Sequence, residues 1–408
     1  MKLEKVHIIG LGYVGLPLAI SAAKSGYRVV GYDINRVKVQ NLIIGKTDSP
    51  EVSNFDLLEL QQNGLLQITH KLEKHSEPGI YIIAVPTPLN SELEPDLSML
   101  ESACDIISNV ISNESLVINE STSFVGTLSN FIRPRIISKS KVDNVDFAVA
   151  PERIDPANKK WNLQSTPRII GGISNRSVNR AVHFYKNFCE NLITVSKPEV
   201  AEAAKLFENT FRQVNIALVN ELSSIAQAYN LSTHEIITAA SSKPYGFMPF
   251  YPSIGVGGHC IPIDPYYLTF SANSLGIETP LISLANEINR MNPLKILERI
   301  TRVLNNDIIG KNIQIAGITY KPNVPDLRES PILEVINQLQ TLGGNVYWHD
   351  PLIDEWKDQH SSELRADIDL GIINTPHDCI DFTRWKDSGL RVIDVSASAK
   401  NFGWAKFL

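Results

Sequence analysis

The sequence predicts an α/β protein built from two Rossmann-like, doubly wound domains that a long central helix joins. Short apolar runs alternate with helical patterns over about the first 195 residues, and the alternation resumes near residue 309. Between them, the stretch 198–231 has no glycine and has proline only at its first position, which predicts one helix of about 32 residues. We place the domains at residues 1–196, 197–300 and 301–408.

Apolar stretches of strand length recur in both halves of the chain. They lie at 5–10, 27–33, 79–88, 115–121, 145–153 and 168–173, and then at 309–322, 344–351, 367–377 and 390–397. Four pairs resemble each other: VHIIGLGYVG and IQIAGITYKP, YRVVGYD and NVYWHDP, IIAVPTP and GIINTPH, SLVINES and LRVIDVS. The repetition indicates two domains of similar topology, although ordinary strand composition produces part of it.

The composition is that of an ordinary globular protein. Of 408 residues, 43% are hydrophobic and 20% are charged, the net charge is -6 and the isoelectric point is about 5.9. Such a weakly acidic chain has no general attraction for nucleic acid or for an anionic membrane. The four cysteines are widely spaced and include no CxxC pair, so we expect no disulfide framework, no metal site and a cytoplasmic location.

The N-terminal segment MKLEKVHIIGLGYVGLPLAISAA is open to two interpretations. Its lysines, apolar run and small residues resemble a signal peptide, but three glycines and a proline interrupt the run. A second strand pattern follows at once, which favours a nucleotide-binding loop. No other segment reaches the ~18 uninterrupted apolar residues of a membrane helix, so we expect no membrane span.

The motif GLGYVG at 10–15 predicts a dinucleotide site. It follows the first strand pattern and opens a helix expected at 16–24, so its glycines allow a tight turn and a close approach to a pyrophosphate. Asp33 ends the second strand pattern, where a carboxylate accepts hydrogen bonds from a ribose diol and repels a 2′-phosphate. We therefore expect NAD, although Arg36 leaves NADP open, and a simple glycine-rich turn is the alternative.

A polar stripe runs along the predicted central helix. Lys205, Asn209 and Arg212 lie at i, i+4 and i+7 and therefore share one face. An ammonium and an amide at that spacing can donate to one oxygen, which is the arrangement that stabilises an alkoxide or oxyanion. The alternative is a solvated face with an ion pair between Lys205 and Glu208.

Cys260 lies between three glycines and two prolines in GVGGHCIPIDPYY. Pro262 and Pro265 suit the first turn of a helix, so a helix is expected just after the cysteine, where the helix N-terminus favours the reactive thiolate. The glycines at 255, 257 and 258 would let a substrate come close, and Asp264 would position water or a lysine. The alternative is a small residue that caps a helix.

A nicotinamide site together with a nucleophilic cysteine indicates a four-electron oxidation. An alcohol oxidised to an aldehyde is trapped on sulfur as a thiohemiacetal, a second hydride transfer produces a thioester, and water releases an acid. Two rivals stay open. One is a two-electron hydroxyacid dehydrogenase, which also places a lysine and an asparagine four residues apart, and the other is a non-catalytic nucleotide-sugar sensor.

Seven ordered motifs resemble those of the UDP-glucose/GDP-mannose dehydrogenase family, the nucleotide-sugar 6-dehydrogenases. They are GLGYVGLPLA, VPTP, ESTSFVGT, APER, EAAKLFENTFRQVNIALVNEL, GVGGHCIPIDPYYL and GITYKPNVPDLRESP, and they span nearly the whole chain. The resemblance implies the fold and chemistry described above, NAD as cofactor, UDP held by the C-terminal domain near Lys321 and Arg328, and a homodimer formed through the central helix.

The resemblance also implies roles for individual residues in the oxidation. Cys260 would be the nucleophile, and Lys205 and Asn209 would steady the oxyanion. Asp264 would organise the catalytic water and the lysine.

The hydrolysis step would use Glu152, in APER, to assist attack on the thioester and Thr122 to place the water. The residues expected to bind the cofactor are Gly10, Gly12, Tyr13, Val14, Gly15, Asp33, Arg36, Pro86, Thr87, Ser121 and Thr122. Those expected to bind the substrate are Glu152, Arg153, Lys205, Asn209, Arg212, Phe250, Tyr251, Ser253, Gly257, Lys321 and Arg328.

One departure from the family pattern bears on the substrate. UDP-glucose enzymes usually carry a second acid four residues after the glutamate that matches Glu152, and this chain has Pro156 there. The surrounding segments look like the subgroup that acts on UDP-N-acetylhexosamines, UDP-N-acetylglucosamine above all, with Arg153 and Arg212 toward the acetamido sugar. UDP-N-acetylmannosamine, UDP-N-acetylgalactosamine and UDP-glucose stay as alternatives, and the sequence does not determine the preferred epimer or the glycan that receives the product.

Overall fold

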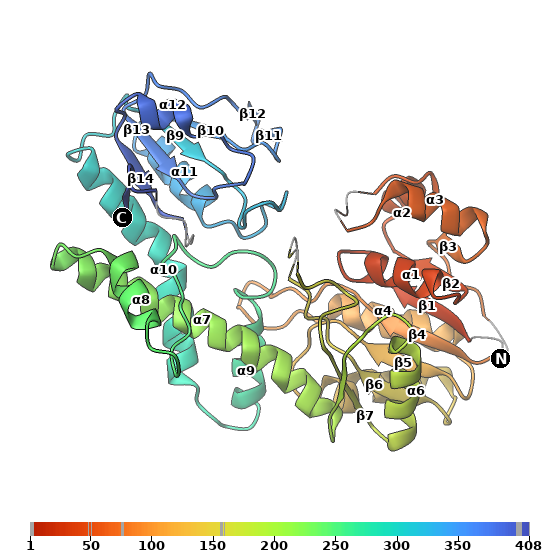
Figure 1. The fold of residues 1–408 in the computed structure, drawn as a ribbon. Coiled ribbons are helices and arrows are strands. Elements are labelled where there is room, and N and C mark those ends of the chain that lie inside the picture. The colour runs from red at the N-terminus through yellow and green to blue at the C-terminus, as the bar shows by residue number, and fades with distance from the viewer. Residues whose placement is uncertain are drawn as a thin grey trace. The chain divides into compact units, whose positions relative to one another are not determined.

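The computed structural model describes residues 4–47, 49, 51–74, 77–155, 158, 160–396 and 402–407 (Figure 1). Pro156, which bears on the substrate class, lies outside these residues. The chain divides into two compact units, Met1–Glu208 with Tyr266–Leu275 (unit 1) and Asn209–Pro265 with Gly276–Leu408 (unit 2). The three domain ranges expected from the sequence stay a prediction.

Unit 1 contains a twisted sheet with the strand order β3-β2-β1-β4-β5-β6-β7-β8. The described pairs are parallel except β6 with β7. The six predicted strands of this region are confirmed, whereas the short edge strands β3 and β8 were not predicted. The bounds are β1 Lys5–Ile9, β2 Val29–Tyr32, β3 Leu66–Thr69, β4 Gly79–Ile83, β5 Leu116–Asn119, β6 Asp146–Val149, β7 Arg168–Gly172 and β8 Leu192–Thr194.

Both faces of this sheet are covered by helices, so its strands are apolar on both sides. Along β4, Ile80 and Ile82 belong to one core cluster and Tyr81 and Ile83 to the other, as the two-residue period of a strand requires. One cluster includes residues of α1, α2, α3 and α6, and the other includes residues of α4, η1 and α5. The helix bounds are α1 Gly15–Lys24, α2 Arg36–Ile43, α3 Asn54–Gln62, α4 Ser98–Val110, η1 Leu128–Ile132, α5 Arg133–Ser140 and α6 Asn175–Tyr185.

The central helix predicted from 198 onward is confirmed as α7, Pro198–Ala228, which has 31 residues (Figure 1). Pro198 suits its first position because the proline ring leaves no N–H to be satisfied there, and acidic Glu199 complements the positive helix end.

Unit 2 contains a parallel sheet with the order β10-β9-β13-β14-β15, shown in blue in Figure 1, and a small hairpin, β11-β12. The four strands predicted in this region are confirmed. The strand bounds are β9 Asn312–Ala316, β10 Asn345–His349, β11 Glu355–Trp356, β12 Gln359–His360, β13 Leu370–Ile373, β14 Val392–Asp394 and β15 Lys406–Phe407. The helices of unit 2 are α8 Thr233–Ser241, α10 Pro280–Val303, α11 Ile332–Thr341 and α12 Thr383–Asp387, whereas α9 Asp264–Asn273 lies mostly in unit 1.

The predicted repetition between the two sheets extends to their first strand-to-helix turns. After β1, Gly10 has φ +98° and donates its N–H to the Tyr32 carbonyl at 2.8 Å. After β9, Gly317 has φ +79° and donates to the His349 carbonyl at 2.7 Å. In each sheet the turn thus begins on a glycine in a conformation that other residues rarely adopt.

An aspartate closes each of these turns from the next strand. The N–H of Leu11 donates to Oδ2 of Asp33 at 3.0 Å, and the N–H of Ile318 donates to Oδ2 of Asp350 at 2.8 Å. The two domains therefore share one turn geometry although only the first has the GxGxxG glycines.

Candidate active site

The three glycines of the nucleotide loop have two roles. A Cβ on Gly15 would lie 1.9 Å from the carbonyl oxygen of Gly10, and a Cβ on Gly10 would lie 2.5 Å from that of Ala84. Gly10 and Gly15 therefore allow the close packing of the turn against the strand ends. A Cβ on Gly12 would meet no atom within 4 Å, so this backbone faces open space where a pyrophosphate can approach.

Asp33 stands at the end of β2 and is well placed for a ribose. Its carboxylate is 13% exposed and accepts N–H groups from Leu11 at 3.0 Å and Asn35 at 2.9 Å. Lys38 lies 3.9 Å away, and Arg36 is exposed at the start of α2. Exposed Tyr13 and half-buried Val14 complete the predicted loop residues.

The other predicted cofactor residues follow β4, which is paired with β1, and β5, which is the next strand in the sheet. Ser121 donates to the Val85 carbonyl at 2.8 Å, and the Tyr267 hydroxyl donates to the Thr87 carbonyl at 3.1 Å. Pro86 is exposed. These residues lie at the carboxyl ends of parallel strands, which is the edge where open α/β sheets bind ligands.

Lys205 and Thr122 line one small hollow of unit 1 together with buried Glu202. Lys205 is only 5% exposed, so its amine is held out of bulk water. Glu202 accepts backbone N–H groups from Gly126 at 2.6 Å and Leu128 at 2.9 Å, but burial outweighs these bonds and raises the pKa of Glu202 to about 7. Sequence reasoning interpreted Glu202 only as an acid that suits the positive N-terminal end of the helix and did not place it in the site.

Glu152 follows β6 in the same unit and is half-buried. Its carboxylate accepts the backbone N–H of Ile154. Burial raises the pKa of Glu152, and the positive charge of Lys205 acts against that rise. A carboxylate with a raised pKa is a stronger base than an ordinary carboxylate, which suits it to accept a proton in a hydrolytic step.

Arg153 has a protein partner. Its guanidinium binds the Glu208 carboxylate in a bidentate pair, with Nη2 2.6 Å from Oε2, and donates to the Pro167 carbonyl at 3.0 Å. The structure therefore pairs Glu208 with Arg153, and a contact between Arg153 and the sugar stays a prediction.

Cys260 lies one turn ahead of α9, as predicted. Its carbonyl accepts the N–H groups of Ile263 at 3.0 Å and Asp264 at 2.8 Å, and its side chain is exposed. Asp264 is 1% exposed and accepts a hydrogen bond from Nδ2 of Asn209 at 2.6 Å. The fold thus brings together three predicted residues, Asn209, Asp264 and Cys260, within unit 2.

The glycines before the cysteine have a packing role that the sequence analysis did not assign. A Cβ on Gly257 would lie 2.7 Å from the Glu329 carbonyl and from Cβ of Tyr320. Gly258 has φ +83° and donates its N–H to the Arg328 carbonyl at 3.2 Å. The expected approach of substrate stays a prediction, but these glycines already allow the loop to pack against residues 320–329.

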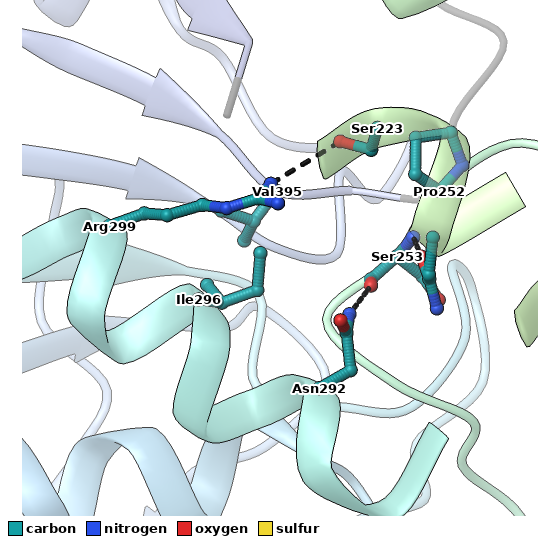
Figure 2. Close-up of a pocket in the computed structure, with 8 residues that line it drawn as sticks. Ser223, Pro252, Ser253, Asn292, Ile296, Arg299 and Val395 are labelled. Carbon is teal, nitrogen blue, oxygen red and sulfur yellow. Dashed lines mark hydrogen bonds between the residues drawn. The ribbon is translucent and has the colours of Figure 1, made fainter. Parts of the chain in front are cut away.

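Two asparagines hold the loop that leads to the cysteine (Figure 2). The Ser253 N–H donates to Oδ1 of Asn220 at 2.9 Å, and the Ser253 carbonyl accepts from Nδ2 of Asn292 at 2.6 Å. Both asparagines are buried, on α7 and α10, and sequence reasoning missed them. The adjoining cavity, of about 10 Å³, has room for about one water.

The predicted loop aromatics pack against helices. Phe250 makes an edge contact with Phe211, with ring centroids 5.9 Å apart, and Tyr251 lies 5.3 Å from the ring of His234. Arg212 is exposed. Their contacts with a substrate stay predictions.

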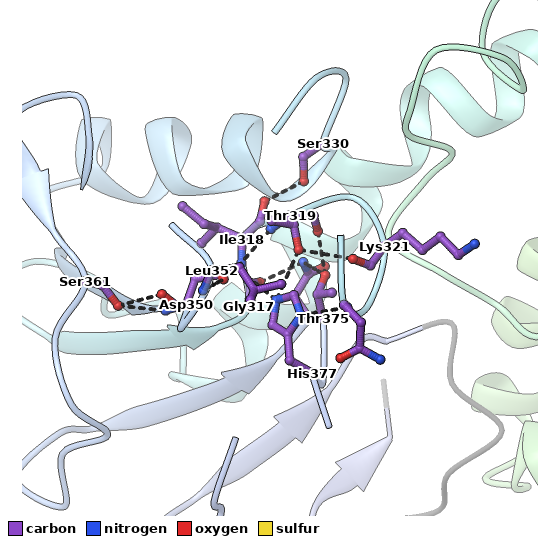
Figure 3. Close-up of polar contacts among 12 residues, drawn as sticks. Gly317, Ile318, Thr319, Lys321, Ser330, Asp350, Leu352, Ser361, Thr375 and His377 are labelled. Carbon is purple, nitrogen blue, oxygen red and sulfur yellow. Dashed lines mark hydrogen bonds and ion pairs between the residues drawn. The ribbon is translucent and has the colours of Figure 1, made fainter. Parts of the chain in front are cut away.

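The turn after β9 carries the predicted phosphate ligands, and hydrogen bonds from buried side chains hold its backbone (Figure 3). His377 accepts the Asn323 N–H on Nδ1 at 2.8 Å and contacts Oδ2 of Asp350 through Nε2 at 3.1 Å. Burial alone would raise the pKa of Asp350, but the bonds from His377 and the backbone lower it. Both aspartates accept protein hydrogen bonds, but the Asp350 side chain is fully buried whereas that of Asp33 is partly exposed.

Lys321 and Arg328 lie on this same turn, 319–330. The Lys321 carbonyl accepts from Oγ1 of Thr319 at 3.3 Å. Arg328 is 47% exposed and binds the Asp326 carboxylate, with Nη2 2.6 Å from Oδ2. A phosphate ligand for Arg328 would share the guanidinium with that carboxylate.

Three segments match models of one family. Residues 4–189 match "UDP-glucose/GDP-mannose dehydrogenase family, NAD binding domain", 199–291 match the central domain, and 314–397 match the UDP binding domain. Within the described residues no helix is long and apolar enough to cross a membrane.

Individual relatives cover most of the chain. UDP-N-acetyl-D-glucosamine 6-dehydrogenase of Salmonella typhi is 36% identical over 86% of this chain and 83% of its own length. UDP-N-acetyl-D-mannosamine dehydrogenase of Pyrococcus horikoshii is 35% identical over 94% and 92%. A solved structure of UDP-D-ManNAc dehydrogenase from Pyrococcus horikoshii has a TM-score of 0.86 at 31% identity and covers 99% of this chain and 98% of that one.

Proposed function

Because the chain belongs to the UDP-glucose/GDP-mannose dehydrogenase family and is an NAD-dependent enzyme, we propose that it oxidises C6 of a UDP-N-acetylhexosamine to the carboxylate. Two NAD and one water are consumed per sugar. The observation that carries the proposal is the contact of Asn209 with Asp264, one turn from Cys260. The open backbone at Gly12 and the carboxylate of Asp33 suit the cofactor, which accepts a hydride when bound.

In the oxidation, Lys205 and Asn209 stabilise the oxygen at C6 as its proton leaves and a hydride departs from carbon. The Cys260 sulfur then adds to the aldehyde carbon, and a proton reaches the oxygen to complete the thiohemiacetal. Loss of that proton and of a second hydride leaves a thioester on Cys260. Asp264 keeps the Asn209 amide oriented toward the substrate, because it holds one of its N–H groups at 2.6 Å.

In the hydrolysis, Glu152 takes a proton from water as the water oxygen attacks the thioester carbon. Thr122 places the water, and the carbon–sulfur bond breaks to restore the thiol. The raised pKa of Glu152 supports this role because it makes the carboxylate a stronger base toward water.

The first expected result is the stoichiometry of the reaction. With limiting UDP-N-acetylglucosamine and excess NAD, we expect two NADH per sugar, measured by absorbance, and one uronic acid, measured by mass spectrometry. A ratio of one, with an aldehyde or ketone as the product, would support the two-electron hydroxyacid dehydrogenase. Binding without NADH from any sugar would support the sensor.

The preferred sugar is the finer part of the proposal. UDP-N-acetylglucosamine is favoured, and the similar proteins named above include enzymes for both the glucosamine and the mannosamine epimers. Values of kcat/KM for these two sugars, UDP-N-acetylgalactosamine, UDP-glucose and a GDP-sugar decide the choice.

We also propose a homodimer through α7. Phe211, Leu218 and Ile225 are spaced by seven residues, share one helix face, and are 43%, 62% and 56% exposed in the single chain. We expect Leu218→Glu to halve the mass found by light scattering, because a charge would be buried in an apolar seam. Phe55→Glu, at an exposed position of α3, is the control. A dimeric Leu218→Glu variant or a monomeric wild type contradicts this interface.

A further inference from the structure

A buried charge pair lies beneath the proposed hydrolytic site. Glu120 follows β5 and is 1% exposed, and its Oε1 lies 2.7 Å from Nη1 of Arg168 on β7, which is 5% exposed. The Tyr185 hydroxyl of α6 also donates to Oε1. The Arg168 guanidinium stacks over the Tyr185 ring at 4.6 Å, so the pair is enclosed by protein on several sides.

The second carboxylate oxygen of Glu120, Oε2, lacks the hydrogen bonds that Oε1 accepts. Within the described ranges, no group donates a hydrogen bond to Oε2 of Glu120, although this atom is shielded from solvent. Burying a carboxylate with half of its hydrogen-bonding capacity unmet is unfavourable, and a buried ion pair adds little stability compared with apolar residues of similar size. Stability therefore does not account for this glutamate.

Both partners contact the backbone that carries Glu152. Nη1 of Arg168 lies 3.4 Å from the Ala150 carbonyl, and the N–H of Glu152 donates to the Glu120 carbonyl at 3.4 Å. The charge pair is thus attached to the segment between β6 and Glu152 at two points.

The charges around Glu152 come from four elements. Burial is the largest influence and raises its pKa, Lys205 of α7 and Arg168 of β7 act against this rise, and Glu120 adds to it. Glu51, ahead of α3, also faces Glu152, since burial and the Glu152 charge raise the pKa of Glu51. Glu120 and Arg168 therefore act on Glu152 with opposite sign.

We propose that Glu120 and Arg168 are positioning residues for the hydrolytic half of the reaction, which hold Glu152 in place and set the pH range in which it accepts a proton from water. This inference rests on the proposed function of Glu152. It assigns a role to Glu120, the first residue of the ESTSFVGT motif, and to Arg168 of PRIIGG, to which the sequence analysis gave no role.

The test is the pH profile of kcat for two single variants. Glu152 must be ionised to accept a proton, so kcat falls as pH drops through its pKa. Glu120→Gln removes a negative charge, which lowers that pKa, and should move the acidic limb down by about one pH unit. Arg168→Met removes a positive charge and should move the limb up by a similar amount.

Three further variants separate this role from simple damage. The double variant Glu120→Gln/Arg168→Met lacks both charges of the pair, and its acidic limb should return toward the wild-type position. Tyr185→Phe keeps both charges and should leave the limb within about 0.3 pH unit. Glu152→Gln should abolish the limb.

The outcomes distinguish the positioning role of Glu120 and Arg168 from the proposed role of Glu152 in hydrolysis. If Glu152→Gln keeps the acidic limb, the role of Glu152 is wrong and the positioning role falls with it. If Glu152→Gln removes the limb but the two charge variants leave it in place, or move it in the same direction, only the positioning role is overturned. Opposite movements with an unchanged KM for NAD support it.

Discussion

Replacement of Cys260 by serine is expected to lower sustained turnover by about 10³-fold or more, while NAD and UDP-sugar still bind. A serine hydroxyl is not ionised near neutral pH and adds to an aldehyde without producing a thioester, so the second oxidation cannot be completed through sulfur. The side chain is exposed and lies outside the cores of unit 2, so the substitution should not unfold the protein. Steady-state NADH production and calorimetric binding of both ligands measure the effect.

Cys379 supplies a matched control for this variant. It is the other exposed cysteine of unit 2, and Cys379→Ser should retain wild-type kcat. Acid quenching of the wild type during turnover should show substrate mass added to the peptide that contains Cys260. Wild-type rates in Cys260→Ser, or free aldehyde as the final product of the wild type, would eliminate the covalent route.

Two alanine substitutions in the nucleotide loop should separate binding from folding. Gly12→Ala should raise the Kd for NAD by at least about tenfold, because the new methyl group projects into the space where the pyrophosphate approaches. It should leave the melting temperature unchanged, since no atom lies within 4 Å of the added Cβ. Titration with NAD and thermal unfolding without NAD measure the two effects.

Gly15→Ala is the counterpart. Its Cβ would lie 1.9 Å from the Gly10 carbonyl oxygen, so the turn must shift, and the melting temperature should fall by about 5 °C or more. The loop interpretation is wrong if Gly12→Ala binds NAD normally. The packing interpretation is wrong if Gly15→Ala is as stable as the wild type.

The repeated domain could be inferred from the sequence because its signals are local. Gly10 and Gly317 end similar strand patterns, and both adopt positive φ beside an aspartate from the next strand. The edge strands β3 and β8 were missed because they lack the continuous buried run of strands such as β2 and β5, which are no longer than β3. Two of the four residues of β3 are buried, and two of the three residues of β8 are exposed.

Residue order also indicated the shared helix face of Lys205 and Asn209 and the helix start after Cys260, because the helical period and the backbone limits of proline operate over a few residues. Only the tertiary structure decided which charged and amide side chains contact each other. Asn209 donates a hydrogen bond to Asp264, and Arg153 pairs with Glu208, and each partner lies 55 residues away in sequence. Chain folding brings such partners together through packing of whole elements, and no local period in the sequence encodes that pairing.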